Sequence, residues 1–230
     1  MSFRFKQFYI EDSKCAMKVG TDGVLLGAWA KTEDVRCQMS DVRILDVGTG
    51  SGLIARMMMQ RFPEAEVEGI DIDEAAVEQA RENGVQAYVS RLQEWKKEGG
   101  YDMIVSNPPY FQNSLKNPDK GRELARHTDS LSYEELIDHS ARLLREGGHL
   151  ALILPADKEA EMRQIAASKN LFLTHVTRVY SKESKPARRV LLAFRYQISD
   201  ISRTEDTLVL EDDKGGRSTA YQELTKDFYL

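Results

Sequence analysis

Short runs of apolar residues alternate with segments that are apolar on one helical face through most of the chain. The runs predict β-strands near residues 42–47, 65–70, 85–89, 101–106, 148–155, 171–179 and 189–196. The amphipathic segments predict helices near residues 23–31, 51–62, 73–83, 132–146, 157–169 and 218–228. Because strands and helices alternate, the pattern predicts an α/β fold: a seven-stranded, mainly parallel sheet with helices on both faces.

Two local signals refine this prediction. Ser132 and Glu135 have the spacing of a capping box, and Gly147-Gly148 is expected to end the helix that follows. Only the loop at 181–188 separates the last two strands, which is too short for a helical crossover, so these strands should be antiparallel.

The pattern is that of one domain over residues 1–230. We divide it into an N-terminal extension (1–40) that contributes to the site, a catalytic core (42–196) and a C-terminal addition (199–230). The addition should hold a strand near 207–210 and a helix near 218–228.

Composition agrees with a folded, water-soluble domain. Of 230 residues, 41% are hydrophobic and 30% are charged. No apolar run approaches the roughly 18 residues that span a bilayer, and the N-terminus lacks the apolar core of a signal peptide, which predicts a cytoplasmic protein with no membrane partner. Cys15, Cys37 and the scattered histidines show no ligand spacing, so we predict no metal site.

Charge is unevenly distributed. The net charge is −5, yet residues 178–196 hold six basic residues against Glu183 alone. From Ser199 onward there are eight acidic and four basic residues. On charge alone, the basic stretch fits a solvated surface as well as a contact with RNA phosphates.

A glycine-rich turn follows the first predicted core strand. Gly48, Gly50 and Gly52 stand between that strand and a helix, and such a turn lets a cofactor approach the backbone. The next strand ends at Asp71, which Ile72 follows, and an acid at that position is placed to bind ribose hydroxyls. Nicotinamide and flavin enzymes carry similar turns, and many strand–helix turns hold glycine for steric reasons alone.

The most informative stretch is Asn107-Pro108-Pro109-Tyr110, directly after the predicted strand at 101–106. The prolines fix the backbone, which leaves an amide, peptide carbonyls and an aromatic ring around one small space. The Asn107 amide oxygen and the Pro108 carbonyl can accept hydrogen bonds from an exocyclic NH₂ while Tyr110 stacks on the attached ring. A hydride-transfer enzyme has no use for this motif.

The order of these motifs, from about Val42 to Tyr196, resembles that of the S-adenosylmethionine-dependent amino-group methyltransferases. Four further segments are similar to one bacterial group, the tRNA1(Val) adenine-37 N6-methyltransferases; they lie at 18–29, 125–128, 185–192 and 224–230. The resemblance implies direct methyl transfer from S-adenosylmethionine to the N6 of adenine 37, in the anticodon region of the tRNA. We also predict that the protein acts as a monomer.

The resemblance also implies roles for single residues. It places the cofactor against Thr21, Asp22, Asp46, Gly48, Gly50, Gly52, Asp71, Ile72 and Asn107, and the target base against Asn107, Pro108, Pro109 and Tyr110. It assigns RNA or base contacts to Phe111, Lys185, Arg188 and Arg189. An N-cap role explains Asp22 equally well. Because strand neighbours point to opposite faces, we expect only one of Arg188 and Arg189 to reach RNA.

The chain departs from the family pattern after its third predicted helix. Asn83-Gly84 runs almost directly into the next strand, and residues 90–95 lack the aspartate that many such enzymes place near the cofactor adenine. Three alternatives stay open: an N6-adenine methyltransferase acting on ribosomal RNA or DNA, a protein glutamine N-methyltransferase, and a module that holds the cofactor without catalysis. The intact Asn107–Tyr110 motif argues against the last of these.

Overall fold

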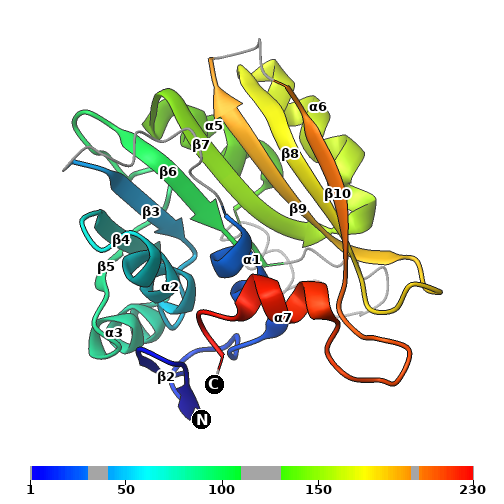
Figure 1. Ribbon diagram of the computed structural model, residues 1–230. Coiled ribbons are helices and arrows are strands. Elements are labelled where there is room, and N and C mark those ends of the chain that lie inside the picture. The colour runs from blue at the N-terminus through cyan, green and yellow to red at the C-terminus, as the bar shows by residue number, and fades with distance from the viewer. Residues whose placement is uncertain (1, 31–40, 110–130, 198–201, 230) are drawn as a thin grey trace, which may run out of the picture.

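A mixed sheet of eight strands forms the centre of the protein, whose computed structural model describes residues 2–30, 41–109, 131–197 and 202–229 (Figure 1). The strand order is β10-β8-β9-β7-β6-β3-β4-β5. The only strand that runs against its neighbours in this sheet is β9, which pairs antiparallel with β7 and β8. The strands are β3 (Arg43–Val47), β4 (Glu66–Asp71), β5 (Gln86–Val89), β6 (Tyr101–Ser106), β7 (Leu144–Pro155), β8 (Leu171–Tyr180), β9 (Ala187–Tyr196) and β10 (Thr204–Val209).

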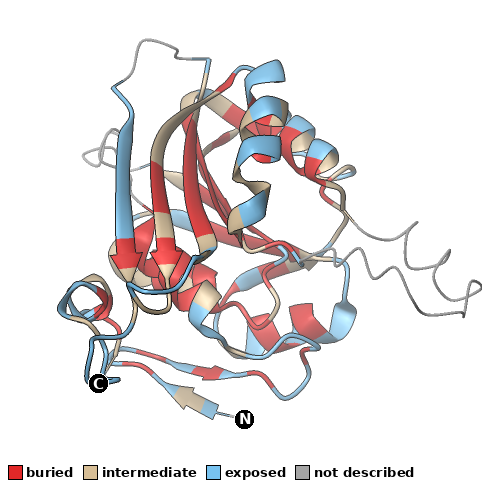
Figure 2. Cartoon of the chain, turned by 90° about the vertical axis from the view of Figure 1, so that its right-hand side faces the viewer, coloured by how far each residue is buried: buried red, intermediate tan, exposed pale blue. Residues whose placement is uncertain are grey.

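The fold class and the antiparallel pair are therefore confirmed, but the sheet has one strand more than the seven predicted for it. The additional strand is β10, which pairs in parallel with β8 and forms the edge of the sheet. The sequence predicted a strand in this region without placing it in the sheet, because its first four residues are exposed and give no buried apolar run. Figure 2 shows the contrast between this exposed edge strand and the buried strands beside it.

Helices cover both faces of the sheet. One face packs on α1 (Thr21–Trp29), α2 (Leu53–Arg61), α3 (Glu74–Glu82) and α7 (Thr219–Thr225). The other packs on α5 (Tyr133–Leu143) and α6 (Glu159–Ser168), which follows a short 3₁₀ turn at Ala156–Lys158. Strands covered on both faces are nearly continuous apolar runs, which is why the sequence located them closely.

The capping box is present at the start of α5, where the Glu135 amide donates to Ser132 Oγ (3.2 Å) and the Ser132 amide donates to Glu135 Oε2 (2.9 Å). The predicted end of this helix is wrong. The helix ends at Leu143, and Gly147-Gly148 lie inside β7, where the pairing with β6 is irregular. A Cβ atom on Gly148 would lie 2.9 Å from the Arg145 carbonyl oxygen, so close packing explains this glycine.

The two ends of the chain lie side by side (Figure 1). Strands β1 (Ser2–Arg4) and β2 (Tyr9–Glu11) form a small antiparallel ribbon that the sequence did not predict. Phe5, Phe8 and Phe228 share one buried cluster with residues of α1 and α2, and the Lys6 amide donates to the Phe228 carbonyl (2.9 Å). In the described ranges, no helix is long and apolar enough to cross a membrane.

Candidate active site

A cavity of about 640 Å³ opens at the carboxyl ends of β3, β4 and β6. The strand order reverses between β3 and β6, and in open α/β sheets ligands bind at such a point. The cavity is lined mainly by residues 15–23, 47–51, 70–73, 90–93 and 106–109. Its volume lies in the range of roughly 300–1,000 Å³ that is typical of small-molecule sites.

The three glycines after β3 serve two different purposes. All three have positive φ (71°, 54° and 80°), which favours glycine. A Cβ atom on Gly48 or Gly50 would meet nothing within 4 Å, so these two residues border open space in the cavity. A Cβ atom on Gly52 would lie 2.7 Å from Val85 Cγ2, so Gly52 allows close packing and is not part of the cavity lining.

Asp71 connects the glycine loop to the end of β4. Its Oδ2 accepts from the Gly50 amide (2.9 Å) and its Oδ1 from the Asp73 amide (3.0 Å). Each carboxylate oxygen can accept a further hydrogen bond, so this half-buried side chain is oriented and still able to bind hydroxyl groups. Ile72 beside it lines the cavity with 55% of its surface exposed, which offers an apolar contact to a flat ring.

Asp46 lies under the loop and does not line the cavity. It is fully buried, and its Oδ2 accepts from Thr49 Oγ1 (2.8 Å) and from the Ala55 amide in the first turn of α2 (3.2 Å). Its Oδ1 has no hydrogen-bond partner in the described structure, and burial raises the pKa of this carboxyl to about 7. Asp46 therefore shapes the glycine loop from below.

The Asn-Pro-Pro motif faces the same cavity. Ser106 Oγ donates to the Val47 carbonyl (2.8 Å), which ties the end of β6 to the end of β3, and Asn107, Pro108 and Pro109 follow on the cavity lining. The Asn107 amide nitrogen lies 4.0 Å from the Met17 sulfur. The structure thus brings Asn107, Pro108 and Pro109 together with the glycine loop. Tyr110 and Phe111 lie outside the described residues.

Residues 15–20 of the N-terminal extension form one wall of the cavity. Buried Asp12 accepts from the Val19 amide (2.9 Å), and its carbonyl accepts from Lys18 Nζ (2.7 Å). Gln79 on α3 accepts from the Ser13 hydroxyl through its Oε1 (3.2 Å), and Asn83, directly after α3, accepts from the Glu11 amide (3.0 Å). Gln79 and Asn83 thus hold the residues just before this wall. The wall itself carries no periodic pattern by which a sequence could reveal it.

Two other predictions concern Asp22 and the neighbouring residues Arg188 and Arg189. The N-cap of α1 is Gly20, not Asp22, so no side chain at the N-cap position caps the start of this helix. Thr21 and Asp22 line the cavity from the first turn of α1, and Asp22 Oδ2 accepts from Arg189 Nε (2.8 Å). Arg188 and Lys185 are exposed, whereas Arg189 is half-buried, so the two neighbouring arginines differ as a strand requires.

Residues 90–93 also border the cavity. They belong to the stretch 90–95, which lacks the aspartate that the resemblance led us to expect there. Within the described ranges, no three His, Cys, Asp or Glu side chains gather as they would around a metal ion.

Comparison with known proteins identifies the family. The family model described as "Methyltransferase small domain" matches residues 33–179. The tRNA1(Val) (adenine(37)-N6)-methyltransferase of Phocaeicola vulgatus is 43% identical, over 99% of this chain and 97% of its own length. The Bacteroides thetaiotaomicron protein of the same name is 40% identical over the same shares. The chain belongs to the tRNA1(Val) (adenine(37)-N6)-methyltransferase family.

Solved structures agree on the fold of this methyltransferase. A predicted O-methyltransferase from Agrobacterium tumefaciens has a TM-score of 0.68 at 20% identity, covering 90% of this chain and 96% of that one. A putative class I S-adenosylmethionine-dependent methyltransferase from Listeria monocytogenes has a TM-score of 0.57 at 16% identity, over 84% and 65% of the two chains.

Family membership confirms the prediction of an S-adenosylmethionine-dependent methyltransferase, and the cavity fits that cofactor. Gly48 and Gly50 leave open space against the backbone, where a Cβ atom would intrude. Asp71 presents a fixed carboxylate for ribose hydroxyls, and Ile72 presents an apolar side chain beside it.

Proposed function

We propose that this protein transfers a methyl group from S-adenosylmethionine to the N6 of adenine 37 in tRNA1(Val). One observation supports this most directly. Asn107, Pro108 and Pro109 share a cavity with the glycine loop and Asp71, so a group that binds an exocyclic amine stands beside a group that binds the methyl donor. The relatives that carry this activity in their name match the chain over 99% of its length.

Each side of the cavity has a separate task in this proposal. S-adenosylmethionine, when bound, supplies an electrophilic methyl group. The Asp71 carboxylate accepts hydrogen bonds from the ribose, while Gly48 and Gly50 let the donor lie against the backbone. Thr21 and Asp22 line the cavity from α1.

On the acceptor side, the Asn107 amide oxygen and the Pro108 carbonyl accept the two N–H groups of the adenine amine. The N6 lone pair is normally delocalised into the ring, and these hydrogen bonds favour a more tetrahedral, more nucleophilic nitrogen. The proton leaves to water after transfer. Tyr110 and Phe111 keep the roles of stacking partner and wall that the resemblance implies.

The RNA is expected to reach the cavity over the turn between β8 and β9. This turn lies at the same edge of the sheet, since β9 begins where the parallel strands end. Lys185 and Arg188 are exposed there and can contact phosphates. An anticodon-loop base is unpaired or readily splayed out, so placing it in the cavity costs less than extruding a base from a duplex.

We further propose that the protein acts in the cytoplasm as a monomer.

The proposal is tested by transfer of labelled methyl from S-adenosylmethionine to an unmodified tRNA1(Val) transcript. A transcript with guanine in place of adenine 37 is the matched control. We expect label in the first transcript and none in the second. Equal labelling of both would contradict the proposed position. Transfer only to ribosomal RNA, to DNA or to a glutamine side chain would contradict the proposed substrate.

A further inference from the structure

An ion pair joins the donor cavity to the turn that is expected to face RNA. Arg189, near the start of β9, places its Nε 2.8 Å from Asp22 Oδ2 in the first turn of α1. The side chains are 32% and 24% exposed, so both are largely removed from water. The two residues are 167 positions apart in sequence.

Arg189 is itself well fixed. Its backbone lies inside the sheet, opposite Pro155 of β7 and Val179 of β8. Its guanidinium also donates to the Arg188 carbonyl (3.0 Å). The cation is therefore anchored on the rigid sheet, whereas its carboxylate partner stands on a short helix.

The helix that carries Asp22 depends on contacts with other elements. It has nine residues, and its N-cap is Gly20, which has no side chain to cap the first amides. Gly23 and Gly27 bring it close to α2, where a Cβ atom on Gly23 would lie 3.0 Å from Leu53 Cδ2. Leu53 and the first turn of α1 all line the cavity, so a shift of α1 would change the shape of the donor site.

The charge of Asp22 matters for the same reason. Asp22 and Asp71 both line the cavity, so two carboxylates border the same space. Two like charges that share a small, partly desolvated space repel each other strongly unless each has a partner. Arg189 neutralises Asp22 and fixes where its carboxylate points.

We infer that Arg189 is a positioning residue for cofactor binding and that, of the two adjacent arginines, Arg188 faces the RNA. This inference rests on the proposed function. It separates two neighbours that the sequence could not distinguish: one acts on the donor through Asp22, and the other is exposed at the surface.

The test is calorimetric titration of each protein with S-adenosylmethionine, without RNA. We expect Arg189→Ala to weaken binding by about three- to tenfold, as loss of a partly buried ion pair implies. Arg189→Lys keeps a cation near Asp22 and should restore most of the affinity. Arg188→Ala is the matched neighbour: it should leave the cofactor Kd unchanged and raise the KM for tRNA.

A second measurement excludes a general loss of structure. In the Asp22→Asn background, Arg189→Ala should change the cofactor Kd by less than about twofold, because the interaction is already lost. In steady state, Arg189→Ala should raise the KM for the cofactor and leave that for tRNA unchanged.

Equal cofactor affinity in wild type and Arg189→Ala would overturn this inference alone. So would the same loss in both backgrounds, because Arg189 would then act independently of Asp22. A wild-type protein that binds no S-adenosylmethionine would overturn the proposed function and this inference with it.

Discussion

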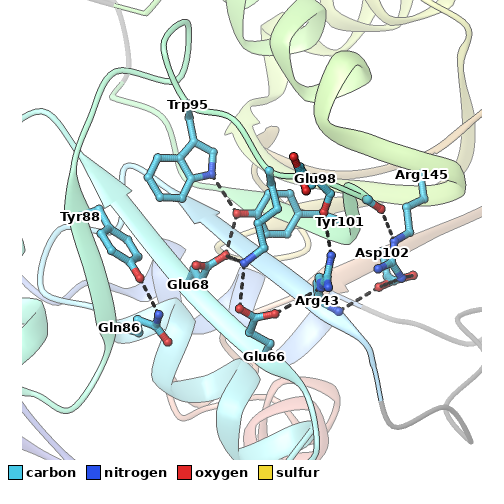
Figure 3. Close-up of polar contacts among 12 residues, drawn as sticks. Arg43, Glu66, Glu68, Gln86, Tyr88, Trp95, Glu98, Tyr101, Asp102 and Arg145 are labelled. Atoms are coloured by element: carbon cyan, nitrogen blue, oxygen red, sulfur yellow. Dashed lines mark hydrogen bonds and ion pairs between the residues drawn. The ribbon is translucent and has the colours of Figure 1, made fainter.

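The end of the sheet where the parallel strands finish (the carboxyl edge) and the end where they begin (the amino edge) differ in how their polar groups are bonded. At the carboxyl edge, glycines border open space, the Asp71 carboxylate keeps acceptor capacity, and Met17 and Ile72 expose more than half of their surface. At the amino edge, polar side chains bind one another (Figure 3). The contrast shows that the strands carry stability at one end and leave the other end free for chemistry.

The amino-edge network is centred on Glu68, a buried carboxylate of β4. Its Oε2 accepts from Lys97 Nζ (2.7 Å) and from the Tyr101 hydroxyl (2.8 Å), which in turn accepts from the Trp95 indole (2.8 Å). A second group joins β3, β6 and β7 through Asp102, which binds Arg145 through both oxygens and accepts from the Arg43 amide. Figure 3 shows these side chains converging on the ends of the strands.

The largest effect on activity should come from Asn107→Ala at the carboxyl edge. Because this removes a proposed acceptor of the reacting amine, we expect the rate of methyl transfer to fall by at least about 100-fold. Single-turnover transfer and cofactor titration measure the two steps separately. Cofactor binding and the unfolding midpoint should change little, and a normal transfer rate would rule out the proposed acceptor.

The largest effect on stability should come from the amino edge. Lys97→Met leaves Glu68 buried without its cation, and we expect the free energy of unfolding to fall by about 2–4 kcal/mol with kcat nearly unchanged. Urea denaturation measures this. Lys169→Met, which breaks an exposed pair with Asp138, is the control and should cost no more than about 0.5 kcal/mol. Similar losses in both variants would remove the distinction between the network and a surface pair.

The same network should limit stability at both extremes of pH. A hydrogen bond from Lys97 lowers the pKa of Glu66 below 4.5, so its contribution is present above that pH and is lost as the pH falls. Burial raises the pKa of Tyr101 above 10, so its contribution is present below pH 10 and is lost as the pH rises. Unfolding midpoints measured from pH 3 to 11 should fall at both ends. In Tyr101→Phe the unfolding midpoint should fall less as the pH rises above 10. An unchanged fall would show that other groups cause it.

A further pH-dependent effect on stability concerns Asp46 under the glycine loop. Burial raises its pKa to about 7, from an ordinary 3.8, so the unfolded chain releases this proton first and stability falls as the pH rises between those values. The Asp46→Asn variant has no carboxyl group to titrate at this position. The slope of unfolding free energy against pH over this interval should therefore be smaller in the variant. Equal slopes would show that Asp46 is ionised in the folded protein.

Most of the fold could be predicted because its strands are buried on both faces and its helices are amphipathic. The elements that the sequence missed or misplaced are exposed or irregular. β1 and β2 have three residues each, β10 is mostly exposed, and the start of β7 contains two glycines.

Some residues of the site could likewise be predicted from the sequence, and others could not. Asp71 and Asn107 could be located from sequence because Asp71 is the last residue of β4 and Asn107 directly follows β6, and both strands end at the cavity. The N-terminal extension was predicted to contribute, but residues 15–20 could not be singled out, since Gln79 and Asn83 hold the residues just before them from a distant part of the chain. The spacing of Asp46 likewise gave no indication that its carboxylate turns beneath the loop.

The packing of residues 5–10 against Phe228 has a consequence for the order of synthesis. The ribosome makes residues 5–10 before any strand of the central sheet, and it makes Phe228 after all of them. Until residues near 228 emerge, the N-terminal ribbon lacks the cluster that covers it and the Lys6 amide lacks its acceptor. The N-terminal ribbon is therefore covered only after the central sheet has been made.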